Sequence, residues 1–363
     1  MTNLFFKSFL YISYTALKLP SLALDWVRIR VFRLHKKSSV HGNLVNSEEG
    51  KYAIFAIYPG TTTTESCLRI LDSLLLNKFS VIVVVNRNDE ADSWISLFKG
   101  SNCVIIERPN IGRDFGAYQA GILYMMRNTM ASEIKRLVLI NDTNYVSPEC
   151  QSKFLNTFLG QDDLNCLMKH YQGVTHGSSN LLNLNLAKIN LKVFMGFWKR
   201  YYPHGIRTRV VFRGEHKLSK VIGHSNLAAA STVLSKDTHS LTTLELNQLY
   251  LWIQRSRPDV YQVLTQDVLN STKEQVSFVV HFAAENFQIS NTFGLYLARR
   301  YFFPLKLDLP YYQLTTKSAM LELMRSQDCG DEEVLKIRSI LEGKGSMANG
   351  GPIIRILKSY QII

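Results

Sequence analysis

The sequence predicts an α/β protein built on a mostly parallel sheet with helices on both faces. Between residues 51 and 140, short apolar runs alternate with segments of helical periodicity, and this order is typical of βαβ units. The runs are apolar at consecutive positions, which indicates strands that are buried on both faces. Polar clusters follow two of the runs, at the strand ends beyond which open parallel sheets bind their ligands.

The elements of the first half follow one another in a regular rhythm. The run at residues 81–85 (VIVVV) is rich in β-branched residues, which favour strands. In chain order, we expect strands at 53–58, 81–85, 103–106 and 137–140, and helices at 61–76, 91–99 and 116–128.

Beyond Pro148 the alternation loosens, and we expect a helical and irregular C-terminal half. Its predicted elements are a helix at 151–159, a strand at 165–168, an apolar and aromatic region at 181–202, and helices at 241–254, 292–300 and 331–341. A polar stretch at residues 40–50 is expected to be a linker.

The composition is that of a folded globular protein. The chain has 363 residues, of which 46% are hydrophobic and 20% are charged, so it is long enough to bury a full core. Its five cysteines are odd in number and widely spaced, without a CxxC pair. This spacing argues against a disulfide framework or a zinc finger and favours a reducing compartment.

The net charge is +13, and residues 1–40 alone carry +6. We expect the remaining excess to be spread evenly over the other 323 residues. A nucleic-acid-binding protein needs a basic face, and the helices expected after Gly50 give no cluster comparable to the N-terminal one. The sequence therefore predicts no nucleic-acid partner.

The basic N-terminal segment is also apolar. Its longest charge-free stretch, residues 8–17, is far shorter than the ~20 residues that span a bilayer. We expect residues 1–37 to form an amphipathic helix on an anionic membrane surface, with Trp26 at headgroup depth. This predicts a cytoplasmic protein, peripheral on the inner face of the cell membrane. The alternative is a helix that caps the protein's own core.

The first polar cluster is the segment NIGRDFGAY at residues 110–118, between the third strand and its helix. Gly112 permits a tight turn, and the start of the following helix offers free N–H groups to an anion. Arg113 is a candidate for a bidentate phosphate contact, and Asp114 for accepting from ribose hydroxyls or a base. Alternatively, Asp114 only caps the helix and Arg113 is solvated.

The second polar cluster, at residues 141–145 (NDTNY), directly follows the fourth strand. Asp142 is a candidate ligand for a divalent cation that bridges the phosphates of a nucleotide. Its neighbours Asn141, Thr143 and Asn144 supply oxygen atoms that suit a hard cation. The alternative is a turn-forming Asn-Asp pair, which is common at strand ends.

The two clusters resemble those of the rhamnan synthesis protein F family, glycosyltransferase-like proteins of bacterial surface polysaccharide assembly. Members carry an N-x-G-x-D-F-G-A-like turn, here starting at Asn110, and an NDS-like strand end, here starting at Asn141. Looser matches follow in order, and the resemblance spans roughly residues 50–310. These looser matches are residues 176–179 (HGSS), 194–198 (FMGFW), 214–219 (GEHKLS), 291–292 (NT) and 304–306 (PLK).

The resemblance implies a GT-A-like, Rossmann-type fold and transfer of a sugar from a nucleotide-diphospho-sugar. It implies that the strand-end carboxylate, Asp142, holds Mg²⁺ or Mn²⁺ with the donor diphosphate. Asn110, Gly112, Asp114 and Asn141 would bind the donor. The sequence has no true D-x-D, because Asn141 precedes Asp142 and Asn144 follows Thr143.

A transferase of the inverting kind also needs a base for the acceptor hydroxyl and positive charge for the leaving diphosphate. Glu215 is the first candidate base and His176 the second, while Lys306 and Arg113 are candidates for stabilising the diphosphate. Alternatively, Glu215 is a carboxylate near a helix N-terminus, and His176 is a surface hydrogen-bonding residue.

The leading hypothesis is a glycosyltransferase that moves a (deoxy)hexosyl unit, rhamnosyl being one candidate, to a polysaccharide or lipid-linked acceptor. The alternative is a non-catalytic GT-A-like scaffold of a polysaccharide-assembly complex. The expected organisation has four parts. These are a basic N-terminal segment (1–40), a nucleotide-sugar-binding half (50–170), an acceptor-side half (171–320) and a C-terminal helical tail (321–363).

Overall fold

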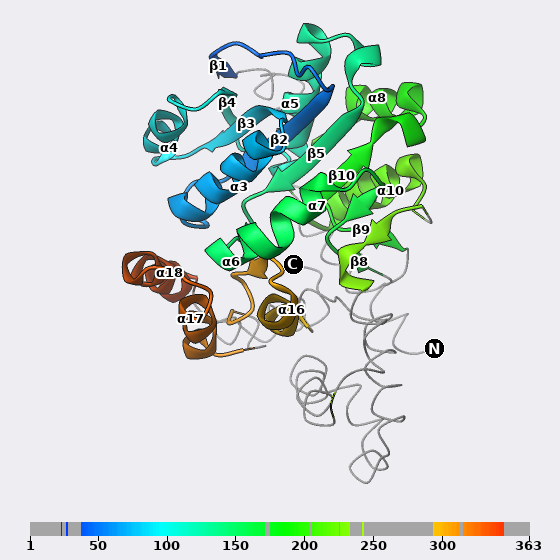
Figure 1. Cartoon of the computed structure of the whole chain (residues 1–363). Coiled ribbons are helices and arrows are strands. Elements are labelled where there is room, and N and C mark those ends of the chain that lie inside the picture. The colour runs from blue at the N-terminus through cyan, green and yellow to red at the C-terminus, as the bar shows by residue number, and fades with distance from the viewer. Residues whose placement is uncertain are drawn as a thin grey trace.

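The computed structural model places a central sheet between two layers of helices (Figure 1). It describes residues 38–170, 175–232 except 204, 206 and 225, 293–311 and 315–344, together with the isolated positions 23, 27 and 242. The N-terminal segment that we expect on a membrane and the helix expected at 241–254 lie outside these residues, apart from those isolated positions.

The main sheet has eight strands in the order β1-β4-β3-β2-β5-β10-β7-β11. The strands β4, β3, β2 and β5 are parallel. Of these four, β2 comes first along the chain and lies beside β5, which comes last. The strands of this sheet are β1 Ser39–His41, β2 Lys51–Ile57, β3 Ser80–Arg87, β4 Cys103–Pro109, β5 Arg136–Asn141, β7 Asn165–Cys166, β10 Leu181–Asn185 and β11 Ala228–Ala229.

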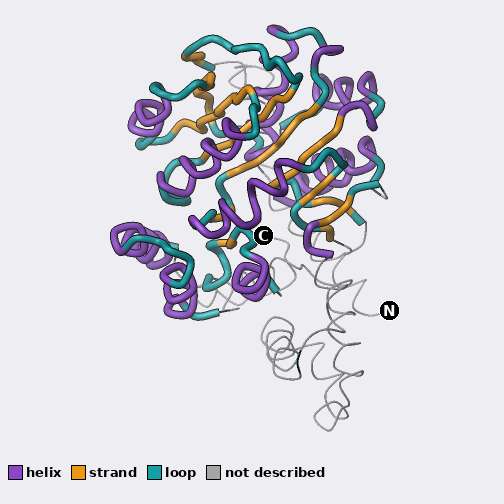
Figure 2. The backbone as a smooth tube through the Cα atoms, viewed as in Figure 1, coloured by secondary structure: helices purple, strands orange, loops and turns teal. Residues whose placement is uncertain are grey.

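Helices flank the sheet on both faces (Figure 2). Consecutive side chains of each strand point to opposite faces, and both sets are buried under helices. In β2, Phe55 faces one core and Ile54 the other. The helices α3, α4, α7 and α16 pack on the first face, and α5, α8 and α10 on the second. The helix bounds are α3 Thr64–Leu76, α4 Ala91–Phe98, α5 Arg113–Asn128, α6 Pro148–Cys150, α7 Asn156–Gly160, α8 Leu191–Arg200, α9 Arg207–Val210, α10 His216–Ile222, α16 Gly294–Tyr301, α17 Lys317–Arg325 and α18 Asp331–Gly343.

Shorter helical turns connect these elements. Two of them are π-helical and continue α6 and α9, so that α6 to α7 and α9 to α10 are each one interrupted helix. The turns are η2 Ala131–Glu133, η3 Gln151–Leu155, η4 Leu186–Lys188, η5 Val211–Glu215 and η6 Ala230–Thr232.

The C-terminal part of the described chain forms a third, smaller core. The helices α16, α17 and α18 pack around the two-stranded sheet of β6 (Asn144–Tyr145) and β12 (Leu305–Lys306). A second two-stranded sheet joins β8 (Lys169–His170) to β9 (His176–Gly177). The third core therefore lies at the carboxyl end of β5, which β6 directly follows.

The predicted α/β class with a mostly parallel sheet is confirmed, and so are the four strands and three helices expected between residues 51 and 140. Two features differ from the expectation. The stretch expected to be a linker contains β1, which pairs antiparallel with β4. The sheet also continues past residue 170, because β10 pairs antiparallel with β5. No helix in the described part of the chain is long and apolar enough to cross a membrane.

Candidate functional site

The parallel strands all have their carboxyl ends on the same side of the sheet. The helices that follow these ends do not all lie on the same face. The helices that follow β2 and β3 lie on one face, whereas α5, which follows β4, lies on the other. The adjacent ends of β2 and β5 therefore form a topological switch point, which is where open α/β sheets bind ligands. Asp142 follows β5 at this point, and its backbone N–H donates to the Ala56 carbonyl of β2 (3.1 Å).

Asp142 is almost fully buried, with 2% of its surface exposed. Its Oδ2 accepts from the backbone N–H of Tyr58 (2.7 Å) and from the Thr61 hydroxyl (3.1 Å). Burial, together with the negative charge of Asp114, raises the pKa of Asp142 to about 7, against the lowering effect of these hydrogen bonds. The site therefore holds a carboxyl group that gains or loses its proton near neutral pH.

Asn141 joins the two polar clusters. Its Nδ2 donates to Asp114 Oδ2 (2.8 Å), and its Oδ1 accepts from the Thr143 hydroxyl (2.7 Å). Asp114 lies in the first turn of α5. The structure thus brings the segment around Asp114 and the strand end around Asp142 together at the switch point.

The turn that leads into α5 depends on glycine at two positions. Gly112 has a φ of +84° and Arg113, the first residue of α5, a φ of +52°, so the chain enters the helix through two left-handed residues. A Cβ atom on Gly116 would lie 2.1 Å from the Ile111 carbonyl oxygen. Asn110 lies in the loop before this turn. Arg113 itself is exposed, and its Nε donates to the Gly205 carbonyl (3.1 Å).

Two residues that we did not predict, Asn86 in β3 and Arg108 in β4, add polar side chains near the carboxyl ends of these two strands. Asn86 at the end of β3 donates to the Ile57 carbonyl of β2 (3.1 Å). Arg108 in β4 donates to Asn86 Oδ1 (2.7 Å) and to the Ile111 carbonyl (2.5 Å). Arg108 is 1% exposed, and burial lowers its pKa to about 10. The sequence signal for this pair was their position, because Asn86 directly follows the run at 81–85 and Arg108 comes two residues after the run at 103–106.

Glu215 and His176 lie in contact, although 39 positions separate them in the sequence. Glu215 Oε2 is 3.5 Å from His176 Nε2, and its Oε1 accepts from the Ser179 hydroxyl (2.5 Å). Burial alone would raise the pKa of Glu215, but the hydrogen bonds from His176 and Ser179 and the charges of His176 and His170 lower it to about 2. Glu215 is therefore ionised and holds the imidazole of His176.

Tyr118 on α5 connects this pair to the strand ends. Its hydroxyl donates to the Ser179 carbonyl (2.8 Å). Burial raises the pKa of Tyr118, and the charges of Asp114, Asp142 and Glu215 raise it further, so all three carboxylates act on one phenol. The Asn141 backbone N–H also donates to the Asn180 carbonyl (3.1 Å). The expected donor-binding and base residues therefore share one region, and nothing in the spacing of Tyr118 pointed to this link.

Lys306 lies on β12, which pairs with β6 just after β5. In the antiparallel pairing of β12 with β6, Lys306 is the partner of Asn144, two residues beyond Asp142. Its side chain is half-buried. Lys306 thus pairs with the short strand that follows Asp142, although 162 positions separate it from Asn144 in the sequence.

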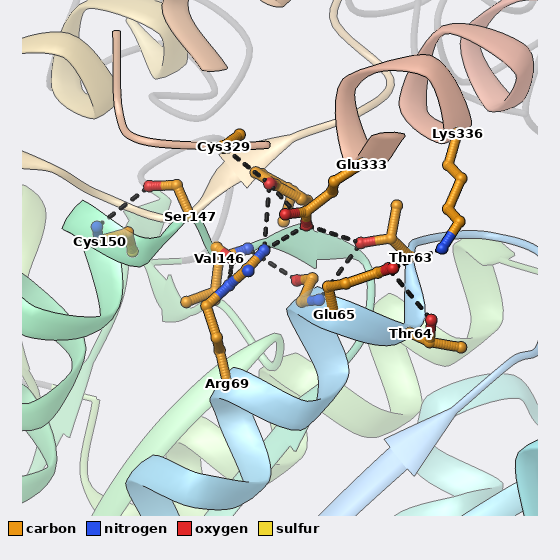
Figure 3. Close-up of polar contacts among 12 residues, drawn as sticks. Thr63, Thr64, Glu65, Arg69, Val146, Ser147, Cys150, Cys329, Glu333 and Lys336 are labelled. Atoms are coloured by element: carbon orange, nitrogen blue, oxygen red, sulfur yellow. Dashed lines mark hydrogen bonds and ion pairs between the residues drawn. The ribbon is translucent and has the colours of Figure 1, made fainter. Parts of the chain in front are cut away.

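A buried polar network on the other side of β6 fixes the C-terminal helices to this edge (Figure 3). Oε1 of Glu333 on α18 accepts from Arg69, from the Tyr145 hydroxyl (2.8 Å) and from the Thr63 hydroxyl (3.1 Å). Arg69 also donates to the Val146 carbonyl (2.7 Å). Glu333 therefore contacts both β6, just after Asp142, and the segment from Tyr58 to Thr63 that binds Asp142.

The candidate cation site has few protein ligands. No group of three or more His, Cys, Asp or Glu side chains in the described residues could hold a metal ion. Proteins commonly bind Mg²⁺ through only one or two carboxylates together with substrate phosphates. Asp114 and Asp142 match this number of ligands. Burial is the main cause of the raised pKa of Asp142, and the charge of Asp114 adds to it; a cation would relieve the second effect.

Comparison with known proteins gives one partial similarity. A segment of 98 residues, 26% of this chain, is 34% identical to the virulence protein VirA of Vibrio anguillarum strain ATCC 68554 / 775, and a second VirA sequence from Vibrio anguillarum matches equally well. The matched segment covers 30% of the length of these relatives. No family model matches the chain, and no solved structure matches it.

Proposed function

We propose that this protein is a glycosyltransferase of the GT-A type that transfers a (deoxy)hexosyl unit from a nucleotide-diphospho-sugar to a polysaccharide or lipid-linked acceptor. The observation that carries the proposal is the hydrogen-bond connection between the strand end of Asp142 and the Glu215–His176 pair. Asn141, which binds Asp114, donates to the Asn180 carbonyl, and the neighbouring Ser179 binds Glu215. Such a transferase needs a place for a diphosphate and, close to it, a proton acceptor. The resemblance to the rhamnan synthesis protein F family supports rhamnose as the first sugar to test.

The donor diphosphate would bind where the strand ends meet the N-terminus of α5. The free N–H groups in the first turn of α5 would then bind the diphosphate, because helix N-termini favour anions. Asp114 and Asp142 would hold Mg²⁺ or Mn²⁺, which neutralises charge on the leaving diphosphate when bound. Lys306 on β12, which pairs with Asn144 of β6, would add positive charge.

The pair of Glu215 and His176 supplies the proton acceptor. A base works best when its pKa is near the operating pH, and the pKa of Glu215 is about 2. We therefore assign proton removal to His176, with Glu215 orienting its imidazole. The acceptor oxygen attacks the anomeric carbon, its proton passes to His176, and the nucleotide diphosphate leaves with the electrons of the broken bond.

The test is release of nucleotide diphosphate by the purified protein from a panel of nucleotide sugars, with Mg²⁺ or Mn²⁺ present. We expect Asp142→Ala and Asp114→Ala to lower turnover at least 100-fold, the scale of a lost electrostatic contact in a transition state. Asp72→Ala, an exposed aspartate on α3, is the matched control and should retain activity. Unchanged turnover in both site variants would refute the assignment.

The alternative is a non-catalytic scaffold that keeps the GT-A-like fold. The observation in its favour is that Asn144 stands where a D-x-D motif has its second aspartate. In addition, Oδ2 of Asp142 is already hydrogen-bonded to Tyr58 and Thr61. Calorimetry with nucleotide diphosphates and Mg²⁺ or Mn²⁺ separates the two hypotheses. Binding that is lost in Asp142→Ala supports the transferase, whereas no binding at millimolar ligand supports the scaffold.

The proposed place of action is the cytoplasmic face of the cell membrane, with residues 1–37 as an amphipathic anchor on anionic lipid. A lipid-linked acceptor would be presented there. Neutralising Arg28, Arg30 and Arg33 in the full chain should weaken its binding to vesicles that contain phosphatidylglycerol. Unchanged vesicle binding would remove this segment from the proposal.

A further inference from the structure

The positive charge outside the N-terminal segment is concentrated in one part of the chain. Contrary to the even spread expected from the sequence, residues 164–236 carry eleven Lys and Arg and a single acidic residue, Glu215, for a net charge of +10. The basic residues are Lys169, Lys188, Lys192, Lys199, Arg200, Arg207, Arg209, Arg213, Lys217, Lys220 and Lys236. The one acidic residue is held in the site by His176 and Ser179, so it does not offset this charge at the surface.

Six of these side chains are exposed on two neighbouring helical segments. They are Lys192, Lys199 and Arg200 on α8, Arg213 on η5, and Lys217 and Lys220 on α10. We call this set the basic helical face. None of the six forms an ion pair with an acidic residue in the described part of the chain, whereas Lys188 is paired with Asp163.

The basic helical face is directed away from the sheet. The segments α8 and α10 pack against each other, and their buried residues, such as Trp198 and Leu218, belong to the same core. Figure 1 shows α8 and α10 together on one side of the molecule. Two apolar side chains, Val193 on α8 and Phe212 on η5, are 45% and 49% exposed among the basic ones.

We propose that the basic helical face is a docking surface for an anionic lipid membrane. Lys and Arg attract the negative surface potential of such a membrane, and an exposed phenylalanine and valine can enter the boundary between headgroups and acyl chains. This surface is separate from the N-terminal anchor proposed above, and the inference does not depend on the proposed function.

The pattern fits lipid better than nucleic acid. Proteins that bind single strands stack bases on exposed aromatic rings, but Phe212 packs edge-on against His216, with ring centroids 5.0 Å apart. An exposed valine gives no stacking surface either. Duplex binding would make no use of the two apolar side chains, since phosphate contacts come from charged and polar groups.

Docking through this face would bring the candidate site to the membrane. Arg213 and Lys217 lie on either side of Glu215 in the same interrupted helix, and Glu215 contacts His176. An acceptor anchored in lipid would then reach the base without leaving the bilayer surface. The docking itself requires no such acceptor.

The test uses the full chain and vesicles with or without phosphatidylglycerol in phosphatidylcholine. The variant Lys199→Gln/Arg213→Gln/Lys217→Gln should bind the anionic vesicles on the order of 100-fold more weakly, at about fivefold per charge. The matched control, Lys99→Gln/Arg127→Gln/Arg325→Gln, removes three exposed charges from other elements and should bind like the wild type. Equal loss in both variants would show a net-charge effect and overturn the proposal.

A second variant separates lipid from nucleic acid. Val193→Ser/Phe212→Ser keeps every charge and should weaken vesicle binding while leaving its salt dependence unchanged. Binding to random duplex DNA is measured in parallel. If the charge variant loses DNA binding and the serine variant retains full vesicle binding, the surface is a nucleic-acid site and the proposal is wrong. Circular dichroism and thermal unfolding confirm that each variant is folded.

Discussion

Asp142 combines burial, two hydrogen bonds and a nearby like charge in one residue. The hydrogen bonds from Tyr58 and Thr61 favour its ionised form, but burial and Asp114 outweigh them, and the pKa rises to about 7. A carboxylate in this position is a source of instability when no cation is bound. That cost is consistent with a group retained for binding rather than for folding.

This pKa predicts how stability changes with pH. The unfolded carboxyl group ionises near pH 4 and the folded one near pH 7, so the free energy of unfolding should fall as pH rises through this window. The full shift corresponds to about 4 kcal/mol, at 1.36 kcal/mol per unit. Asp142→Asn keeps an oxygen acceptor and should lack this decline in urea unfolding between pH 4 and 8. Parallel curves for wild type and variant would contradict the assigned pKa.

Gly116 gives a second prediction at the level of one residue. A methyl group there would meet the Ile111 carbonyl at 2.1 Å and the Arg108 guanidinium at 2.9 Å. Gly116→Ala should therefore cost about 1–3 kcal/mol of unfolding free energy by overpacking and weaken nucleotide-diphosphate binding through the displaced turn. Gly100→Ala, where no atom lies within 4 Å, is the matched control and should be close to neutral. A stable Gly116→Ala variant would mean that the turn relaxes easily.

Among the elements, α18 has an importance that its position near the end of the chain does not suggest. Glu333 binds Arg69 of α3, Thr63 at the N-cap of α3 and Tyr145 of β6. The Ser147 hydroxyl donates to Gln327 (2.8 Å), which in turn donates to the Ala298 carbonyl of α16 (2.7 Å). The C-terminal helices are therefore bound to both chain segments that surround Asp142.

Removing the Glu333 carboxylate should release these helices. Glu333→Ala leaves the largely buried Arg69 without its counter-ion, and we expect a loss of about 3–5 kcal/mol of unfolding free energy. Amide hydrogen exchange should rise first in α17 and α18. The control Glu332→Ala removes an exposed carboxylate whose partner is Lys336 and should cost less than about 1 kcal/mol. Similar exchange in both variants would show that the network does not hold the helices.

The elements also show which parts of the fold are readable from sequence. Runs such as residues 81–85 predict a buried parallel strand because the pattern is local. The candidate site residues that follow strands can be located from the same runs. The antiparallel pairing of β10 with β5 and the contact of Glu333 with Tyr145 join segments 40 to 190 residues apart. No local pattern encodes such contacts, so Tyr118, Arg69 and Glu333 became visible only in the structure.

At the scale of the whole molecule, the main sheet unites the two halves expected from the sequence. The boundary placed at residue 170 falls within this sheet, since β10 and β11 follow it and β2 to β5 precede it. One core also contains residues from both sides, such as Tyr118 and Trp198. Folding of the first half is therefore expected to require the second.

A fragment of residues 38–170 tests this expectation. It would lack β10 and the helices α8 and α10, leaving the edge of β5 exposed and α5 as the one helix of the second face that remains. We expect no cooperative unfolding transition in urea, whereas the full chain should give one. A sharp transition with a near-ultraviolet signal of packed aromatic residues in the fragment would show that the first half folds alone.

The short strands at the two edges of the main sheet affect how copies of the protein meet. In the described residues, β1 pairs through three residues at one edge and β11 through two at the other. Long unpaired edges invite strand exchange and aggregation between molecules, and very short edge strands limit it. The long parallel strands that carry the candidate site lie inside the sheet, so their backbone is also protected from pairing with another chain.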